Sequence, residues 1–198
     1  VKNFEIIMDQ VEWADAVLIG PGLGTNKETI DLLTMIYENI NKPLVVDADG
    51  LNPFYKNRDL LKKLQCVLTP HHGELSRLLS ISLGELKEKM VNHMEGFASS
   101  YPSVLIAKQP SSIIVHNISG YINTSGNPGL ATAGTGDVLS GMVTAFIAQG
   151  YNLVESSCIS TYIHGYVADK MSKKISERGL IASDLLLEIA SSMSRYES

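Results

Sequence analysis

The sequence predicts an α/β fold with a mostly parallel central sheet flanked by helices, in one domain over residues 1–198. Short apolar runs alternate with helical stretches along most of the chain, which is typical of βαβ units. Several of these runs are apolar at every position, as strands that are covered on both faces tend to be. Hydrophobic residues make up 44% and charged residues 19% of the chain, a balance that indicates a folded globular protein.

The first third of the chain contains two strands with a helix between them. The strands are predicted at 16–19 and 43–46, where the residues are continuously apolar. Thr25 and Glu28 form a capping-box pattern, so we expect Thr25 to cap the intervening helix. A short helix is predicted at 59–64.

The middle of the chain repeats the pattern, and its end is mainly helical. Strands are predicted at 66–69 and 104–107, with a helix at 74–79 after the first. A second capping box at Ser82 predicts a helix that runs to about Ser99. The remaining elements are a β-hairpin from strands at 112–115 and 121–123, then helices at 136–148, 153–175 and 184–194, the last capped by Ser183.

Charge and cysteine content exclude several classes of protein. The net charge of -5 gives no general attraction to nucleic acid or to an anionic membrane, so we expect neither as a partner. Cys66 and Cys158 show neither metal-ligand spacing nor a disulfide framework, which is typical of a reducing compartment. No signal peptide is recognisable at the start of the chain. We therefore expect a cytoplasmic protein. The chain lacks an initiator methionine and reaches its first strand by Ala16, so we also expect the domain to be N-terminally incomplete.

Three unusual loops follow predicted strands, at 20–24, 47–52 and 69–74. Ligands of open α/β sheets bind at the carboxyl ends of strands, so the three loops are expected to meet at one edge. Any one of them alone could be a simple turn. For Asp47 and Asp49 two roles stay open, orientation of a metal or solvent and capping of a turn.

A fourth loop carries the strongest chemical signal. No charged residue other than histidine occurs from Gln109 to Gly136, and Gly134-Thr135-Gly136-Asp137 then opens an apolar helix. Glycine-rich backbone at a helix start presents amide groups and a positive dipole end, which together bind a phosphoryl group. Asp137 could cap this helix, or it could accept a proton from a hydroxyl during phosphoryl transfer. The glycines on both sides of Thr135 favour the catalytic role. His164, within a later helix, is expected to be a packed histidine with a hydrogen-bond partner.

Five motifs in this order resemble the ADP- or ATP-dependent NAD(P)H-hydrate dehydratases, a carbohydrate kinase-related family of the ribokinase-like superfamily. The similarity extends over nearly the whole chain. The motifs are Ile19-Gly-Pro-Gly-Leu-Gly24, Val46-Asp-Ala-Asp-Gly-Leu-Asn52, Leu68-Thr-Pro-His-His-Gly-Glu74, Gly126-Asn-Pro-Gly-Leu-Ala-Thr132 and Ala133-Gly-Thr-Gly-Asp-Val-Leu-Ser-Gly141.

The resemblance implies an enzyme that repairs nicotinamide nucleotides. Members of the family dehydrate NADHX and NADPHX to NADH and NADPH at the expense of ADP or ATP. By this resemblance Asp137 is the catalytic residue and also contacts the hydrate, together with Gly22, Gly24 and His71. The nucleotide-binding residues would be Lys108, Gln109, Pro110, Ser111, Ser112, Gly134, Thr135 and Gly136. Mg2+ is expected on the phosphates, without a metal site of protein side chains. A homo-oligomer is also expected, and whether an epimerase domain precedes this one stays open.

The sequence departs from the family pattern at three places. His72 stands where proline is usual, and Gln109-Pro110 stands where glycine is usual after Lys108. By the resemblance, we also expect these residues to lack the family's N-terminal segment, which completes the sheet and part of the hydrate pocket.

Two other functions stay open, and a third is disfavoured. The same anion site and Asp137 would serve a small-molecule kinase of this superfamily that phosphorylates a vitamin-precursor alcohol. A fragment could also bind nucleotide without turning it over. An NAD-binding dehydrogenase is disfavoured because the glycines from Gly20 to Gly24 lack the spacing of a dinucleotide fingerprint.

Overall fold

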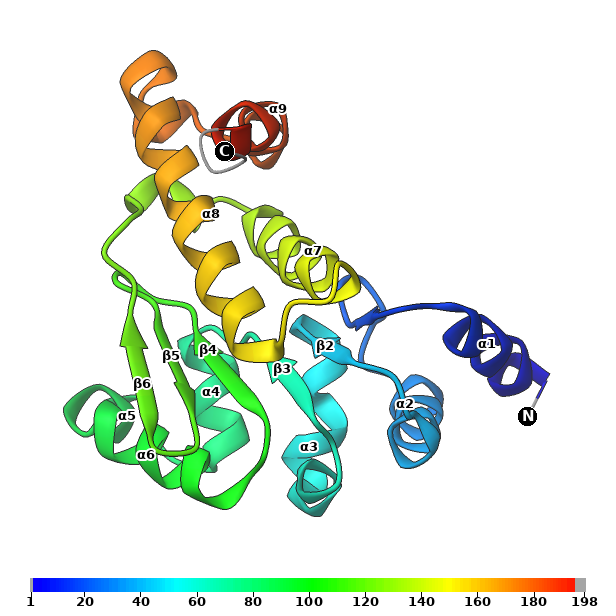
Figure 1. Cartoon of the computed structure of the whole chain (residues 1–198). Coiled ribbons are helices and arrows are strands. Elements are labelled where there is room, and N and C mark those ends of the chain that lie inside the picture. Colours follow the sequence, from blue (N-terminus) through cyan, green and yellow to red (C-terminus); the bar gives the residue numbers. More distant parts are fainter. Residues whose placement is uncertain (1, 195–198) are drawn as a thin grey trace.

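In the computed structural model, which describes residues 2–194, six strands form one sheet in the order of the sequence (Figure 1). The first four strands are parallel, and the last two are added antiparallel as a hairpin. This confirms the predicted α/β class and its mostly parallel sheet. The strands are β1 (Val17–Ile19), β2 (Leu44–Val46), β3 (Cys66–Leu68), β4 (Val104–Ala107), β5 (Ile113–His116) and β6 (Ser119–Ile122).

The continuously apolar strands are covered on both faces, as their composition predicts. In β2, Leu44 and Val46 pack with the helices of one face, while Val45 packs with those of the other. The first face carries α2 (Lys27–Asn39), α3 (Asn52–Lys56), α4 (His72–Leu79) and α6 (Met90–Ser100). The second face carries α7 (Thr135–Ala148) and α8 (Leu153–Ile175), against which α9 (Ala182–Met193) packs (Figure 1).

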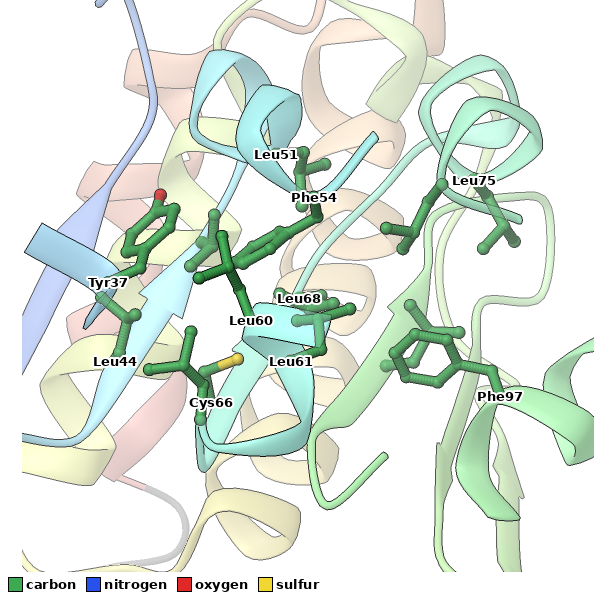
Figure 2. Close-up of a cluster of buried hydrophobic side chains, with 14 of the residues drawn as sticks. Tyr37, Leu44, Leu51, Phe54, Leu60, Leu61, Cys66, Leu68, Leu75 and Phe97 are labelled. Carbon is green, nitrogen blue, oxygen red and sulfur yellow. The ribbon is translucent and has the colours of Figure 1, made fainter. Parts of the chain in front are cut away.

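A buried tyrosine fixes the loop that follows β2. The ring of Tyr37 stacks on Phe54 with centroids 4.9 Å apart, inside the larger core cluster (Figure 2). Its hydroxyl donates a 2.8 Å hydrogen bond to the carbonyl of Gly50. Burial raises the pKa of Tyr37 well above its ordinary value, so the phenol stays protonated and remains a donor. The 3₁₀ helix Ala48–Leu51 is therefore anchored from the core side.

Two predicted helix caps are wrong by one or two residues. Asn26, not Thr25, caps α2, and its Oδ1 accepts a hydrogen bond from the amide of Thr29 at 2.8 Å. Both residue types cap helices, and asparagine is the stronger of the two. Ile181, not Ser183, lies at the cap position of α9, where Asp184 accepts from the Ile181 amide at 3.0 Å. The carboxylate of Asp184, in the first turn of α9, thus takes the capping role that was predicted for Ser183.

Three helical segments also differ from prediction. The short helix expected at 59–64 is a 3₁₀ helix over Arg58–Lys62, and α3 precedes it without having been predicted. The helix predicted from Ser82 to about Ser99 is divided into α5 (Leu83–Glu88) and α6, because Lys89 leaves the helical conformation with φ −130° and ψ 31°. Helix α1 (Lys2–Trp13) was not predicted. Over residues 2–194, none of the helices has the length and apolar character that crossing a membrane requires.

Candidate functional site

An ion pair joins the loops after β2 and β4. The ammonium of Lys108 lies 2.7 Å from Oδ1 of Asp47, whose side chain is 1% exposed. The same carboxylate oxygen accepts the amide of Ala48 at 2.8 Å, which favours capping over the other role left open for Asp47, and its lysine partner was missed. A Cβ atom at Gly136 would lie 3.2 Å from Nζ of Lys108. The start of α7 therefore lies directly against the lysine ammonium.

The first glycine loop is fixed to the loop after β2. The Gly20 position allows no side chain, because a Cβ atom there would lie 1.6 Å from the carbonyl oxygen of Asp47. The amide of Gly24 donates a 2.9 Å hydrogen bond to Oδ2 of Asp49. Gly22, with φ 73°, has open space around it. Asp49 thus orders the loop that carries Gly22 and Gly24, which favours the turn-bonding role over a metal role.

His71 begins helix α4. Its Nδ1 accepts hydrogen bonds from the amides of Gly73 at 3.0 Å and Glu74 at 3.4 Å, and Glu74 accepts the His71 amide at 2.8 Å. Because Nδ1 is an acceptor, the ring proton of the neutral imidazole is on Nε2, which lies 3.3 Å from the second oxygen of Glu74. The side chain of His71 is 57% exposed. Glu74 and His71 thus form the capping box of α4, and the capping role of His71 was not foreseen.

The start of α7 has the geometry of an anion site. Gly134 occupies the cap position with φ 86°, and no side chain in the described part of the chain caps this helix. The hydroxyl of Thr135 lies within 2.8 Å of the carbonyl oxygens of Leu130 and Thr132, so it is directed away from the helix end. The amides of a first helical turn have no acceptor within the helix and are available to an anion. Asp137 lies in this turn and is exposed, so the interpretation of Asp137 as a cap is wrong.

Side chains of helix α8 form hydrogen bonds with the glycine-rich segment. Nε2 of His164 lies 2.9 Å from the carbonyl oxygen of Thr135, and burial lowers the pKa of His164 to about 4. The neutral imidazole therefore donates this bond, which confirms the expectation of a packed and satisfied histidine. Asp169 accepts the amide of Gly126 at 2.8 Å and the side-chain amide of Asn127 at 3.0 Å. The role of Asp169 was missed, because no local pattern links it to a segment so distant in the sequence.

The segment after β4 runs beside the histidine loop. The amide of Lys108 donates a 2.9 Å hydrogen bond to the carbonyl of Pro70, and Lys108 forms a parallel β-bridge with His71. The chain then turns at Ser111, whose φ is 62°. Of the predicted site residues, the structure thus brings together Lys108, His71 and Gly136. Gly24 is joined to them through the loop after β2, because this loop carries both Asp49, which binds Gly24, and Asp47, which binds Lys108.

Asp137 lies at an apolar groove between α7 and α9. An apolar wall beside a carboxylate is a common design of small-molecule sites, in which few polar groups fix the orientation of a ring. The groove is lined by Val138, Gly141, Met142 and Ala145 of α7, and by Leu186, Ile189, Ala190 and Met193 of α9.

Similar proteins have the same fold. A bifunctional NAD(P)H-hydrate repair enzyme of Dictyoglomus turgidum is 38% identical over 190 residues, which cover 93% of this chain and 36% of that protein. The structure of a ribokinase-like superfamily protein of Enterococcus faecalis V583 matches with a TM-score of 0.84 and 27% identity, over 98% of this chain and 68% of that one. An ADP/ATP-dependent NAD(P)H-hydrate dehydratase of Bacillus subtilis, co-crystallised with ATP and Mg2+, matches with a TM-score of 0.80 and 24% identity, over 92% of this chain and 66% of that one. The fold is therefore ribokinase-like, as expected.

The chain spans about a third of the length of the first curated relatives that it matches, with 34%, 36% and 35% of their residues covered. The sequence model of the family described as NAD(P)H-hydrate dehydratase matches residues 1–191. This match includes all the loops described above, from Gly20 to Asp137. The chain therefore belongs to the NAD(P)H-hydrate dehydratase family.

Proposed function

We propose that this domain dehydrates NADHX and NADPHX to NADH and NADPH at the expense of ADP or ATP. The observation that carries the proposal is the position of Lys108, whose ammonium lies beside Gly136 in the first turn of α7, one residue before Asp137. A cation, free helix amides and a carboxylate then lie within one small region. This combination fits phosphoryl transfer, in which charge is neutralised on one side and a proton is removed on the other.

The residues divide the chemistry between them. The amides of Gly136 and Asp137, with the helix dipole, would hold the phosphate that is transferred, and Lys108 would neutralise its charge. Asp137 would accept the proton of the ring hydroxyl. The hydroxyl oxygen would then form a bond to phosphorus, and the bond from phosphorus to the departing nucleotide would break. The ring nitrogen's lone pair then expels the phosphate, and the neighbouring carbon loses a proton to restore the ring double bond. His71, Gly22 and Gly24 are proposed to contact the hydrate.

Mg2+ would be held mainly by the nucleotide. Among residues 2–194, no three His, Cys, Asp or Glu side chains lie close enough together to hold a metal ion. Both described aspartates after β2 are already engaged, Asp47 with Lys108 and Asp49 with Gly24. Mg2+ in nucleotide sites often uses one or two carboxylates and completes its shell with phosphate oxygens and water, so the residues present are compatible with it. When bound, the ion would neutralise phosphate charge.

The test is a restoration assay. Purified NADHX or NADPHX is mixed with the protein, Mg2+ and either ADP or ATP, and the return of the reduced-nicotinamide absorbance is followed. Recovery of absorbance with one nucleotide supports the proposal and identifies the phosphoryl donor. Nucleotide binding without recovery from either hydrate would contradict it, and a phosphorylated thiamine-precursor alcohol in a parallel assay would favour a kinase. Light scattering on the same sample tests the expected homo-oligomer.

A further inference from the structure

Two loops continue side by side beyond the ends of β3 and β4. The amide of Lys108 donates to the carbonyl of Pro70 at 2.9 Å, and His71 and Lys108 form a parallel bridge. One residue further along each loop, Nε2 of His72 lies 3.1 Å from Oε1 of Gln109. The two loops are thus joined first by backbone and then by side chains.

The donor and the acceptor of this side-chain contact follow from the remaining groups. The other end of the Gln109 side chain, Nε2, lies 3.5 Å from the carbonyl oxygen of Ser111. An amide nitrogen only donates and an amide oxygen only accepts, so His72 carries the proton on Nε2 and donates it to Gln109. Both side chains are half-buried, which limits the water that competes for the contact.

Gln109 also governs the turn that follows it. Pro110 fixes its own φ and restricts Gln109 to extended backbone. Ser111 has φ 62°, a left-handed conformation that a residue with a side chain adopts only when its surroundings hold it there. The hydroxyl of Ser112 donates to the carbonyl of Gln109 at 3.3 Å. The backbone and the side chain of Gln109 therefore both contact the Pro110–Ser112 turn.

His72 is not needed to start helix α4. It is the first helical residue, a position that has no intrahelical amide bond and at which proline is favoured. Capping is provided by His71 and Glu74. What the His72 side chain adds is its contact with Gln109, and these are two positions at which the sequence departs from the family pattern.

We propose that His72 and Gln109 form a positioning pair that holds the Pro110–Ser112 turn in the conformation that accepts the nucleotide. The inference rests on the proposed function, because it takes residues 108–112 as the nucleotide segment. The pair touches the loop of His71 on one side and the nucleotide segment on the other. His72 acts on the nucleotide through Gln109 and the turn, and neither residue of the pair takes part in bond making.

The experiment compares four variants with the wild-type protein. Gln109→Met keeps the length of the side chain and removes its hydrogen bonds, and His72→Pro removes the donor while preserving the helix start. The double variant tests whether the two residues act together. His72→Gln keeps a nitrogen donor. The matched control is Gln149→Met, because Gln149 is exposed at the end of α7 and its side chain bonds only to the carbonyl of Ala145 in the described structure.

Each variant is titrated with ADP and with ATP in the presence of Mg2+ by calorimetry, and its kcat, KM and thermal midpoint are measured. Gln109→Met and His72→Pro should each weaken nucleotide binding and raise the nucleotide KM by about 3- to 10-fold, the effect of one hydrogen bond. At saturating nucleotide, kcat should stay within about twofold of wild type. The double variant should be no weaker than the weaker single variant, because both substitutions remove the same contact between His72 and Gln109. His72→Gln should recover most of the affinity, and Gln149→Met should match wild type.

Wild-type affinity in both single variants would overturn the positioning pair, as would additive losses in the double variant. A fall in kcat that parallels a fall in thermal midpoint would also overturn it, because the residues would then only support the fold. If wild type binds nucleotide but restores no hydrate, the proposed function fails while the titrations still decide the pair. If wild type restores hydrate and the variants bind as it does, the pair alone fails. If wild type binds neither ADP nor ATP, both are overturned.

Discussion

The ammonium of Lys108 and the carboxylate of Asp47 lie 2.7 Å apart although β3 separates the strands that carry them. Asp47 is almost fully buried, so Lys108→Met leaves a buried carboxylate without its counter-ion. We expect this substitution to lower the free energy of unfolding by about 3 kcal/mol and to abolish turnover. The double variant Asp47→Asn/Lys108→Met should recover most of the stability but no activity. Urea unfolding measures the stability of both variants, and the restoration assay measures their turnover. A Lys108→Met variant as stable as wild type would contradict the pairing.

Asp137→Asn should separate binding from chemistry. Asp137 is exposed and does not cap α7, so its removal should leave the helix intact. We expect turnover to fall about a hundredfold or more, because the proton acceptor is lost, while the nucleotide dissociation constant changes little. Asp184→Asn is the matched control, since Asp184 also lies in a first helical turn but in α9. An Asp137→Asn enzyme that keeps its activity would contradict the assignment of Asp137 as the base.

His71 has two roles that different substitutions distinguish. His71→Ala removes the cap of α4 and should cost about 1 kcal/mol of unfolding free energy. His71→Asn supplies another good capping side chain but removes Nε2. Both variants should raise the KM for the hydrate more than the KM for ADP, and only the alanine variant should unfold at lower urea concentration. Equal effects on the two KM values would argue against contact between His71 and the hydrate.

Stability should decrease with acid in a range set by His164. Its pKa is lowered from 6.5 to about 4 because it is buried, so the unfolded chain binds a proton more readily than the folded one. The contribution of His164 to the free energy of unfolding should therefore be complete above pH 6.5. It should decline as the pH falls toward 4, by on the order of 3 kcal/mol. His164→Gln keeps a donor for the Thr135 carbonyl and should flatten this decline. Measurements should stay above pH 4.5, because Glu188 has a lowered pKa and adds its own dependence below that value.

The sequence was most informative where one residue type permits only one local structure. Apolar runs located the strands, and glycines at positive φ marked the loops, as at Gly24 and Gly134. Two capping positions were missed because neighbouring residues, such as Thr25 and Asn26, compete for the same amides. The contact between Lys108 and Asp47 could not be predicted, because it depends on which strands are neighbours and on how far a lysine reaches across β3. His71 was predicted to contact the substrate. Histidine is not among the usual capping residues, so the role of His71 as the cap of α4 could not be predicted from the sequence.

The position of α7 has a consequence for how the protein is made. Val45, Val67 and Val104 of the central strands are covered by Leu139 and Val143 of this helix, which leaves the ribosome later than the strands it covers. Until then, a nascent chain bears an apolar sheet face that is prone to association with other chains. The step that shields this face also brings the first turn of α7, the proposed anion site, to the ion pair of Lys108 and Asp47. Docking of α7 thus completes both the core and the proposed site, so we expect a nucleotide that binds at the start of α7 to stabilise the whole domain.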